Sequence, residues 1–173
     1  MMKMTAKEIQ SVSSFTTTAG KVFAREMLQQ QVDIWRAQEM VVVMTNGCFD
    51  LLHAGHIVTL ETSRSFGNVL IVAVNSDRSV KELKGPDRPL NNEEDRARVI
   101  AALSCVDAVT IFAEETAISL IDAIRPHVYV KGGDYNLQTL PERDAVERYG
   151  GKVVFCPLLP GHSTSTLIAA CRE

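Results

Sequence analysis

Short runs of apolar residues recur along the chain, separated by segments in which apolar positions have a different spacing. The runs lie at residues 40–44, 69–74, 108–112, 128–130 and 153–155 and are rich in β-branched side chains. Continuous apolar runs of this length are typical of strands buried on both faces of a sheet. The pattern therefore predicts five buried strands.

The segments between these strands have the marks of helices. Apolar positions recur at helical spacing over residues 25–35, Asn91 or Asn92 can cap a helix, and Thr116 can cap the next. Gly67 can end the helix that follows the first strand. Strands that alternate with helices predict an α/β fold, a Rossmann-like doubly wound five-stranded parallel sheet in a single domain. In such sheets ligands bind outside the carboxyl ends of the strands, where the strand order changes direction.

Composition supports one soluble domain and narrows its partners. The 173 residues are 46% hydrophobic and 23% charged, which suffices for one core. A net charge of -3 gives no global attraction to nucleic acid or to a membrane surface, so we expect neither as a partner. The longest apolar run, 69–74, is far shorter than the ~20 residues of a membrane helix.

The cysteines and the amino-terminal segment suggest a cytoplasmic protein. The four cysteines are far apart with no CxxC pair, so reduced thiols are expected rather than a zinc site or a disulfide framework. The start lacks the apolar core of a signal peptide. We interpret residues 1–20 as a loosely ordered leader and residues 21–173 as the domain.

The segment after the first predicted strand has the order of a phosphate site, with a glycine turn between a strand and a helix. Gly47 allows close approach of the backbone to a ligand, and the first helical turn offers unpaired N–H groups. His53 and His56 are three residues apart, so they share one face of that turn. They can donate hydrogen bonds to phosphate oxygens and, if charged, stabilise added negative charge. Each histidine could instead be an ordinary polar residue at a helix start, but their pairing around Gly55 favours the phosphate site.

This stretch, residues 45–56 with its His-Ala-Gly-His signature, resembles the nucleotidyltransferase superfamily of cytidylyl- and adenylyltransferases, in which the two histidines bind the triphosphate. The resemblance is greatest to the heptose 1-phosphate adenylyltransferases and runs from about residue 21 to 168. The segments that recur in matching order are Asn75-Ser76-Asp77, Lys81, Lys84-Gly85, Arg88-Pro89, and residues 130–135 and 161–166. That branch occurs alone or as the C-terminal half of a bifunctional heptose kinase and adenylyltransferase. Without the kinase half, the resemblance implies that a separate kinase supplies the sugar phosphate.

The resemblance and the residue chemistry together give a set of candidate site residues. The predicted catalytic residues are His53, His56, Lys84 and Arg88. The predicted nucleotide-binding residues are Asn46, Gly47, Cys48, Phe49, Gly55, Lys131, Gly132, Asp134, His162, Ser163, Thr164 and Ser165. The predicted substrate-binding residues are Asp50, Asn75, Asp77 and Lys81. No residue is predicted to ligate a metal.

Several of these assignments have a plainer alternative. Lys81, Lys84 and Arg88 bracket Gly85-Pro86, which we interpret as a loop following the second strand, where cations could meet a triphosphate and a sugar phosphate. A solvated charged surface is the alternative, strongest for Lys81. Asp50 can orient the acceptor or a cation, or hold a turn.

Two further segments also have both a functional and a plain interpretation. Lys131 and Gly132 follow the fourth strand, where the backbone can approach a nucleotide and Asp134 can accept hydrogen bonds from ribose or base donors. A plain turn explains the two consecutive glycines equally well. The hydroxyls at 163–166 can cap the last helix, hold phosphate, or do both.

The function implied is transfer of AMP from ATP to a heptose 1-phosphate, which gives ADP-heptose and pyrophosphate by in-line attack on the α-phosphate. The acceptor is already an anion, so catalysis would depend on positioning and charge stabilisation, with Mg²⁺ bound as the ATP complex. We expect a cytoplasmic homo-oligomer, a dimer or higher, that supplies ADP-heptose for lipopolysaccharide. The alternatives are a cytidylyltransferase acting on glycerol 3-phosphate or a related alcohol, and a non-catalytic nucleotide-binding regulatory module. A dinucleotide-dependent oxidoreductase is disfavoured, because no GxGxxG follows the first strand.

Overall fold

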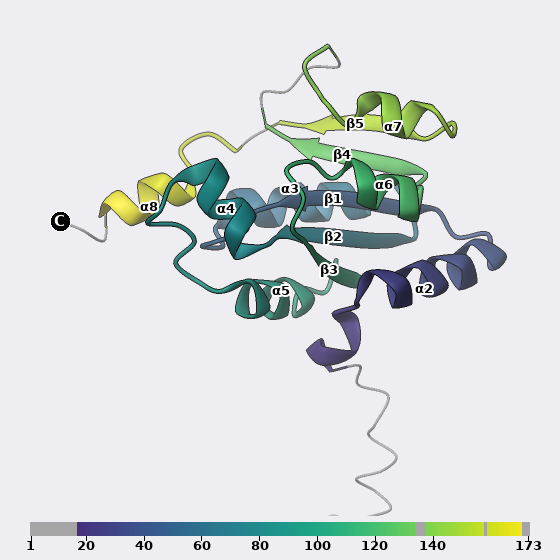
Figure 1. Ribbon diagram of the computed structural model, residues 1–173, viewed down its shortest axis with the longest axis horizontal. Helices are drawn as coiled ribbons and strands as arrows, with labels where there is room; N and C mark the ends of the chain where they lie inside the picture. Colours follow the sequence, from purple (N-terminus) through teal and green to yellow (C-terminus); the bar gives the residue numbers. More distant parts are fainter. Residues whose placement is uncertain (1–16, 134–137, 158, 171–173) are drawn as a thin grey trace, which may run out of the picture.

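Five parallel strands form one sheet in the computed structural model, which describes residues 17–133, 138–157 and 159–170 (Figure 1). The spatial order is β3-β2-β1-β4-β5. The strands are β1 (Val42–Gly47), β2 (Val69–Asn75), β3 (Ala108–Phe112), β4 (Val128–Gly132) and β5 (Lys152–Cys156). This is the doubly wound, Rossmann-like arrangement predicted, with all five strands at the predicted places.

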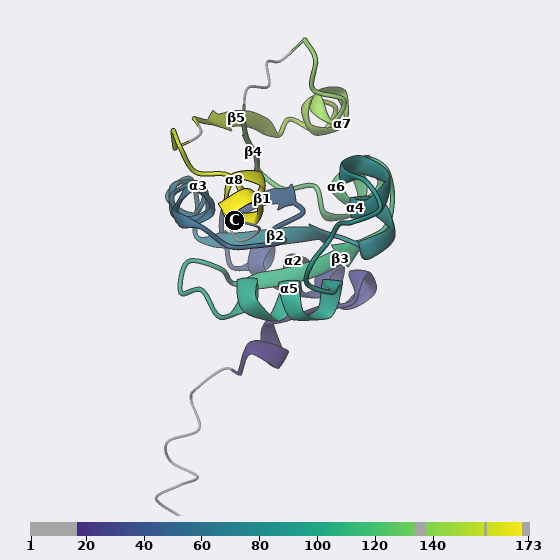
Figure 2. The same cartoon turned by 90° about the vertical axis from the view of Figure 1, so that its left-hand side faces the viewer.

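Helices cover both faces of the sheet, and each face has its own apolar core. On one face α2 (Arg25–Ala37), α6 (Ile118–Ile124) and α7 (Arg143–Glu147) pack on side chains such as Met44, Ile71 and Tyr129. On the other face α3 (Ala54–Arg64) and α5 (Glu93–Ala101) pack on side chains such as Val43 and Val130. Figure 2 shows α3 on one side of the sheet and α6 on the other. Continuous apolar strands result because alternate residues enter different cores.

Two helices lie at the carboxyl ends of the strands, where ligands bind in this class of fold. Helix α4 (Asp77–Lys84) follows β2 directly, and α8 (Thr164–Ala170) ends the described chain. Figure 1 shows both at the same end of the sheet. The strand order reverses between β1 and β4, so these helices border the switch point.

The segment between β2 and the Gly85-Pro86 loop forms a helix, α4, that was not predicted. Ser76 caps it by accepting a hydrogen bond from Ser79 N–H at 3.2 Å, and Val80 is buried against the domain. Thr116 does not cap α6, whose N-cap residue is Ala117. Asn92 does cap α5, accepting from Asp95 N–H at 2.8 Å.

The chain ahead of α2 is tied to the domain where it is described. A 3-10 helix, η1 (Thr18–Lys21), packs on α5, and Lys21 Nζ donates a hydrogen bond to the Val106 carbonyl at 2.8 Å. Phe23 N–H donates to the Val109 carbonyl of β3, also at 2.8 Å. Residues 1–16 of the predicted leader lie outside the described residues, so its boundary stays a prediction. Over the described ranges, no helix has the length and apolar character needed to cross a membrane.

Candidate active site

A cavity of about 610 Å³ opens at the carboxyl ends of β1, β2 and β4, beside the switch point. It brings together predicted residues from five separate parts of the sequence. Those that line it are Asn46, Gly47, Cys48, Phe49, Asp50, His53, Gly55, His56, Asn75, Lys84, Arg88, Lys131, Gly132, His162, Ser163, Thr164 and Ser165. Asp77 and Lys81 do not line it, and Asp134 lies outside the described residues.

A second cavity of about 630 Å³ lies at the opposite, amino ends of the strands. Its wall includes Arg36, Arg125, His127 and Tyr149 but none of the predicted site residues. The two cavities have similar volumes, so their chemistry identifies the candidate active site and their size does not.

Two stacked imidazoles form one wall of the cavity. His53 is the N-cap residue of α3, and its carbonyl accepts a hydrogen bond from His56 N–H at 2.9 Å. The two rings have centroids 3.8 Å apart and planes at 25°, and the His162 ring lies 6.5 Å from that of His53. A Cβ on Gly55 would lie 3.0 Å from the His53 ring and 3.4 Å from His162 Cβ. The glycine of the signature therefore lets the imidazoles and the segment before α8 approach one another.

Both imidazoles are neutral near pH 7 in the absence of a ligand. Burial, and secondarily the neighbouring His53, lower the pKa of His56 to about 4. Burial, and secondarily His162, also lower the pKa of His53. Their Nδ1 atoms are buried and lack hydrogen-bond partners in the described part of the chain. The positive charge considered from the sequence therefore requires a bound anion, which favours the protonated form.

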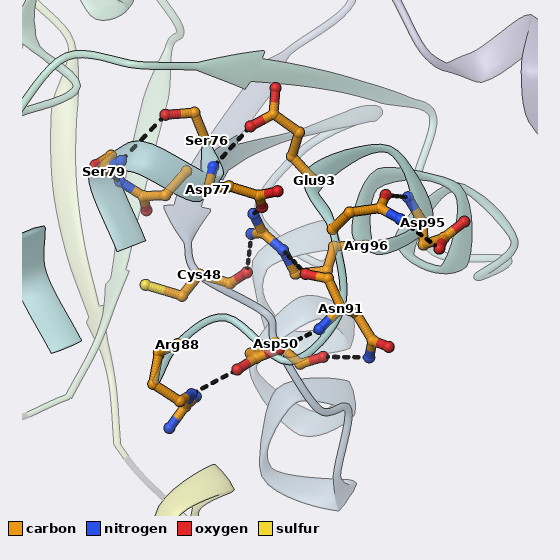
Figure 3. A network of polar contacts seen from close by, with 12 residues as sticks. Cys48, Asp50, Ser76, Asp77, Ser79, Arg88, Asn91, Glu93, Asp95 and Arg96 are labelled. Atoms are coloured by element: carbon orange, nitrogen blue, oxygen red, sulfur yellow. Dashed lines mark hydrogen bonds and ion pairs between the residues drawn. The ribbon is translucent and has the colours of Figure 1, made fainter. Parts of the chain in front are cut away.

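Asp50 holds the segment after α4 against the end of β1 (Figure 3). Its fully buried carboxylate accepts hydrogen bonds from Arg88 Nε at 2.5 Å, Leu90 N–H at 2.8 Å and Asn91 N–H at 3.0 Å. Burial raises the pKa of this carboxyl, but hydrogen bonds from Asn91, Arg88 and Leu90 outweigh burial and lower it overall. Asp50 thus fixes the Arg88 guanidinium at the cavity. Of its two predicted roles, the contacts match the local structural one.

Asp77 belongs to a second buried network that lies beside the cavity. Arg96 of α5 is fully buried and donates to Asp77 Oδ1 at 2.7 Å, to the Cys48 carbonyl at 2.6 Å and to the Asn91 carbonyl at 2.9 Å (Figure 3). The carboxylate assigned to substrate is therefore engaged by Arg96. Sequence reasoning missed Arg96, because a basic residue in a charged amphipathic helix is typical of a solvent-exposed face.

The two lysines of α4 have different surroundings. Both lie in the last turn of the helix and both are exposed, but Lys84 lines the cavity and Lys81 does not. Gly85 ends the helix with φ 98°, a conformation that glycine adopts without strain. The position of Lys81 matches the solvated-surface alternative, whereas Lys84 and Arg88 both line the cavity.

The opposite wall of the cavity is built from the ends of β1 and β4. Asn46 Oδ1 accepts hydrogen bonds from Tyr129 OH at 2.6 Å and from Lys131 Nζ at 3.1 Å. Lys131 Nζ also lies 3.6 Å from Glu142 Oε1, and both side chains are largely buried. Burial lowers the pKa of Lys131 although Glu142 acts in the opposite direction.

Hydroxyl groups at the start of α8 cap the helix and also line the cavity. Ser163 Oγ accepts from Thr166 N–H at 3.1 Å, and Thr164 Oγ1 donates to the Leu51 carbonyl at 3.3 Å. Ser163, Thr164 and Ser165 also line the cavity. The capping role predicted from the sequence is therefore present together with exposure to the cavity.

The turn after β1 is shaped by an aromatic ring. A Cβ on Gly47 would lie 3.1 Å from the Phe49 ring, so at this glycine the close approach is by Phe49. The same ring lies 5.3 Å from that of His56. Burial raises the pKa of Cys48 despite the nearby cations Lys84, Arg96 and Arg88, so its thiol is protonated at neutral pH.

The cavity wall also contains residues that sequence reasoning missed. Glu142 precedes α7, Glu115 and Thr116 precede α6, and Thr59 lies in α3. None of these residues belongs to a motif or a recognisable spacing, so only the tertiary fold brings them to the site. Glu142 is of most interest because it is an almost fully buried carboxylate.

Taken together, the cavity can bind a polyanion beside a polar organic group. Neutral imidazoles, Arg88 and Lys84 provide donors and positive charge for phosphates, while amides and carboxylates provide partners for hydroxyls. In the described ranges no group of three His, Cys, Asp or Glu side chains is arranged to hold a metal ion. Mg²⁺ prefers phosphate oxygens and water with one or two carboxylates, so these residues fit a Mg²⁺ ion carried in by a nucleotide.

Comparison with known proteins agrees with this arrangement. Residues 44–166 match the family model described as cytidylyltransferase-like. The chain is 47% identical over 148 residues to the bifunctional protein HldE of Syntrophotalea carbinolica, covering 86% of this chain and 30% of that protein. It is 49% identical over 158 residues to the bifunctional protein HldE of Koribacter versatilis, covering 91% of this chain and 32% of that protein. The chain thus spans about a third of the length of these relatives.

A solved structure shares the fold. The crystal structure of the lipopolysaccharide core biosynthesis protein from Thermoplasma volcanium has a TM-score of 0.58 and 27% sequence identity to this chain. The match covers 69% of this chain and 97% of that protein.

Proposed function

The chain belongs to the cytidylyltransferase-like family of nucleotidyltransferases, and on this premise we propose that it transfers AMP from ATP to a heptose 1-phosphate, giving ADP-heptose and pyrophosphate. The observation that carries the proposal is the stacked pair His53 and His56 in one cavity with Arg88 and Lys84. Identity of about half the residues to bifunctional HldE proteins supports the heptose branch of the family. The product would serve lipopolysaccharide synthesis, as does the structural neighbour from Thermoplasma volcanium, a lipopolysaccharide core biosynthesis protein.

The reaction is an in-line displacement at the α-phosphate. An oxygen of the sugar 1-phosphate forms a bond to the α-phosphorus as the bond to the bridging oxygen of pyrophosphate breaks. The attacking group is already an anion, so no general base is required. The protein contributes alignment of the two substrates and stabilisation of charge.

The donors and cations of the cavity have separate tasks in this scheme. His53 and His56 donate hydrogen bonds to the triphosphate, and Arg88, held by Asp50, stabilises the charge that develops as pyrophosphate leaves. Lys84 lies where the phosphates of the two substrates meet, and the hydroxyls of Ser163 to Ser165 border the triphosphate. Mg²⁺ enters with ATP and neutralises part of its charge.

Localisation and partners follow from this assignment. ATP and a sugar phosphate are the substrates. The free cysteines Cys48, Cys105 and Cys156 fit a reducing compartment, and we place the protein in the cytoplasm.

The test is a pyrophosphate-release assay with the full chain and Mg²⁺, in which ATP and CTP are each paired with heptose 1-phosphate and with glycerol 3-phosphate. We expect release only with ATP and heptose 1-phosphate, and its loss in His56→Ala. Release with CTP and glycerol 3-phosphate would overturn the substrate assignment, and nucleotide binding without turnover on any pair would indicate a regulatory module.

A further inference from the structure

Glu142 has one carboxylate oxygen without a partner although the residue is only 3% exposed. Its Oε1 atom lies 3.6 Å from Lys131 Nζ and 3.4 Å from the Ala117 N–H. Its Oε2 atom has no hydrogen-bond partner among the residues described. Buried carboxylate oxygens are normally hydrogen-bonded, and this residue lines the cavity. Its free oxygen therefore marks a place where a ligand donates a hydrogen bond.

The position of Glu142 indicates which part of a ligand it meets. Tyr129 packs in the core beneath α6 and α7, and Lys131, two residues further along β4, extends on the same face of the sheet. Glu142 pairs with Lys131, so it lies on this face, whereas His53 and His56 belong to the α3 side. The cavity thus has an imidazole wall on one side and a carboxylate wall on the other.

Charge decides how the two walls are used. Glu142 is paired with Lys131, so this wall offers phosphate no net positive charge, and phosphate instead finds donors and cations at His53, His56, Arg88 and Lys84. A carboxylate oxygen accepts strong hydrogen bonds from hydroxyl groups, so the carboxylate wall fits the hydroxyl-rich part of a substrate.

We propose that Glu142 is a specificity-determining residue whose free Oε2 accepts a hydrogen bond from a hydroxyl group of the acceptor sugar. The inference rests on the proposed function and adds the recognition of the sugar ring to it. Ribose also carries hydroxyls, but the triphosphate is assigned to His53 and His56 on the α3 side, and Lys131, predicted from the sequence to bind the nucleotide, is assigned here to the acceptor side with Glu142. On the α3 side, Thr59 lies 3.2 Å from the position of a Cβ on Gly132, so α3 itself packs closely on the end of β4. The acceptor is left with the α6 and α7 side, where Glu142 lies.

The test compares the wild-type chain with Glu142→Gln, which keeps the shape of the side chain and removes its charge. Glu147→Gln is the matched control, because Glu147 lies in the helix that Glu142 precedes and its side chain is 56% exposed. Pyrophosphate release is measured with ATP and heptose 1-phosphate, with monodeoxy analogues of that sugar phosphate, and with 2′- and 3′-deoxy-ATP. Thermal unfolding of each variant checks that the fold is intact.

We expect Glu142→Gln to raise the KM for heptose 1-phosphate about 10-fold and to leave the KM for ATP within about twofold, because a charge-assisted hydrogen bond is lost. With the wild type, kcat/KM should be about 10- to 100-fold lower for one monodeoxy sugar phosphate than for heptose 1-phosphate. With Glu142→Gln, the difference in kcat/KM between these two sugar phosphates should be much smaller. Glu147→Gln should match the wild type throughout.

Three results would overturn the assignment. Unchanged sugar kinetics in Glu142→Gln would mean that the free oxygen contacts only solvent. If Glu142→Gln changed the loss in kcat/KM caused by 2′- or 3′-deoxy-ATP, the ribose would be the group that Glu142 contacts. If a deoxy sugar lost the same factor in kcat/KM with the variant as with the wild type, the role of Glu142 would be purely structural. Failure of the wild type to use any sugar 1-phosphate would overturn the proposed function together with this inference. The other three outcomes differ from it because in each of them the wild type is active.

Discussion

Replacing Asp50 by alanine should destabilise the protein strongly, because this carboxylate is fully buried and three donors converge on it. Removing one partner of a buried ion pair costs about 3–5 kcal/mol. Arg88 is 15% exposed, so water offsets part of this cost, while the N–H groups of Leu90 and Asn91 lose their acceptor. We expect the free energy of unfolding to fall by about 3–5 kcal/mol in Asp50→Ala. Asp50→Asn keeps one acceptor oxygen and should lose about 1–3 kcal/mol.

Urea unfolding followed by the fluorescence of the single tryptophan, Trp35, measures these differences. Asp87→Ala is the control, since this exposed carboxylate is the immediate neighbour of Arg88 in the sequence. The network lowers the pKa of Asp50 in the folded state, so its contribution is present above the ordinary carboxyl pKa and is lost as pH falls through the folded value. The difference in the free energy of unfolding between wild type and Asp50→Ala should therefore become smaller at acidic pH. A loss below about 1 kcal/mol, or an equal loss in Asp87→Ala, would mean that the Asp50 network does not stabilise the fold.

The remaining predictions concern the imidazoles, the Arg96 network and the lysines of α4. His56→Ala should lower kcat/KM for pyrophosphate release by about 100- to 1,000-fold. Because burial lowers the pKa of His56 to about 4, the unfolded chain binds an extra proton between about pH 4 and 6.5. The thermal midpoint should fall as pH drops through that window, and fall less in His56→Ala. Arg96→Met should lose about 3–5 kcal/mol in urea unfolding, and Asp77→Asn less, because that side chain is 34% exposed. Lys84→Ala should reduce kcat/KM about 10-fold or more, whereas Lys81→Ala should leave it unchanged.

The sheet could be predicted from the sequence because its signal is local. Each strand is a short apolar run; the central strand β2 is buried throughout, whereas the edge strand β5 is only partly buried. Helix α4 could not be recognised in the same way. It has eight residues, five of them charged, and its stability comes from the Ser76 cap and from burial of Val80. A short polar segment with these properties resembles a loop until its tertiary contacts are known.

The residues of the candidate site likewise fall into those set by local sequence and those set by distant contacts. Residues that share a short segment, such as His53, Gly55 and His56, could be found together because their spacing fixes their geometry. Glu142 and Arg96 could not, since each acquires its role from partners far away in the sequence. Glu142 lies 11 residues from Lys131, and Arg96 lies 48 residues from Cys48. Buried charges of this kind look like surface residues in a sequence, and only the fold shows that they are enclosed.

Direct transfer of AMP to a sugar 1-phosphate can be followed by isotope labelling. Heptose 1-phosphate carrying ¹⁸O in its phosphate group is incubated with ATP, Mg²⁺ and the full chain, and the masses of the products are measured by mass spectrometry. We predict ADP-heptose that retains all of the label and pyrophosphate that carries none, because the sugar phosphate oxygen attacks the α-phosphorus. Label in pyrophosphate, or ADP as the nucleotide product, would contradict direct transfer.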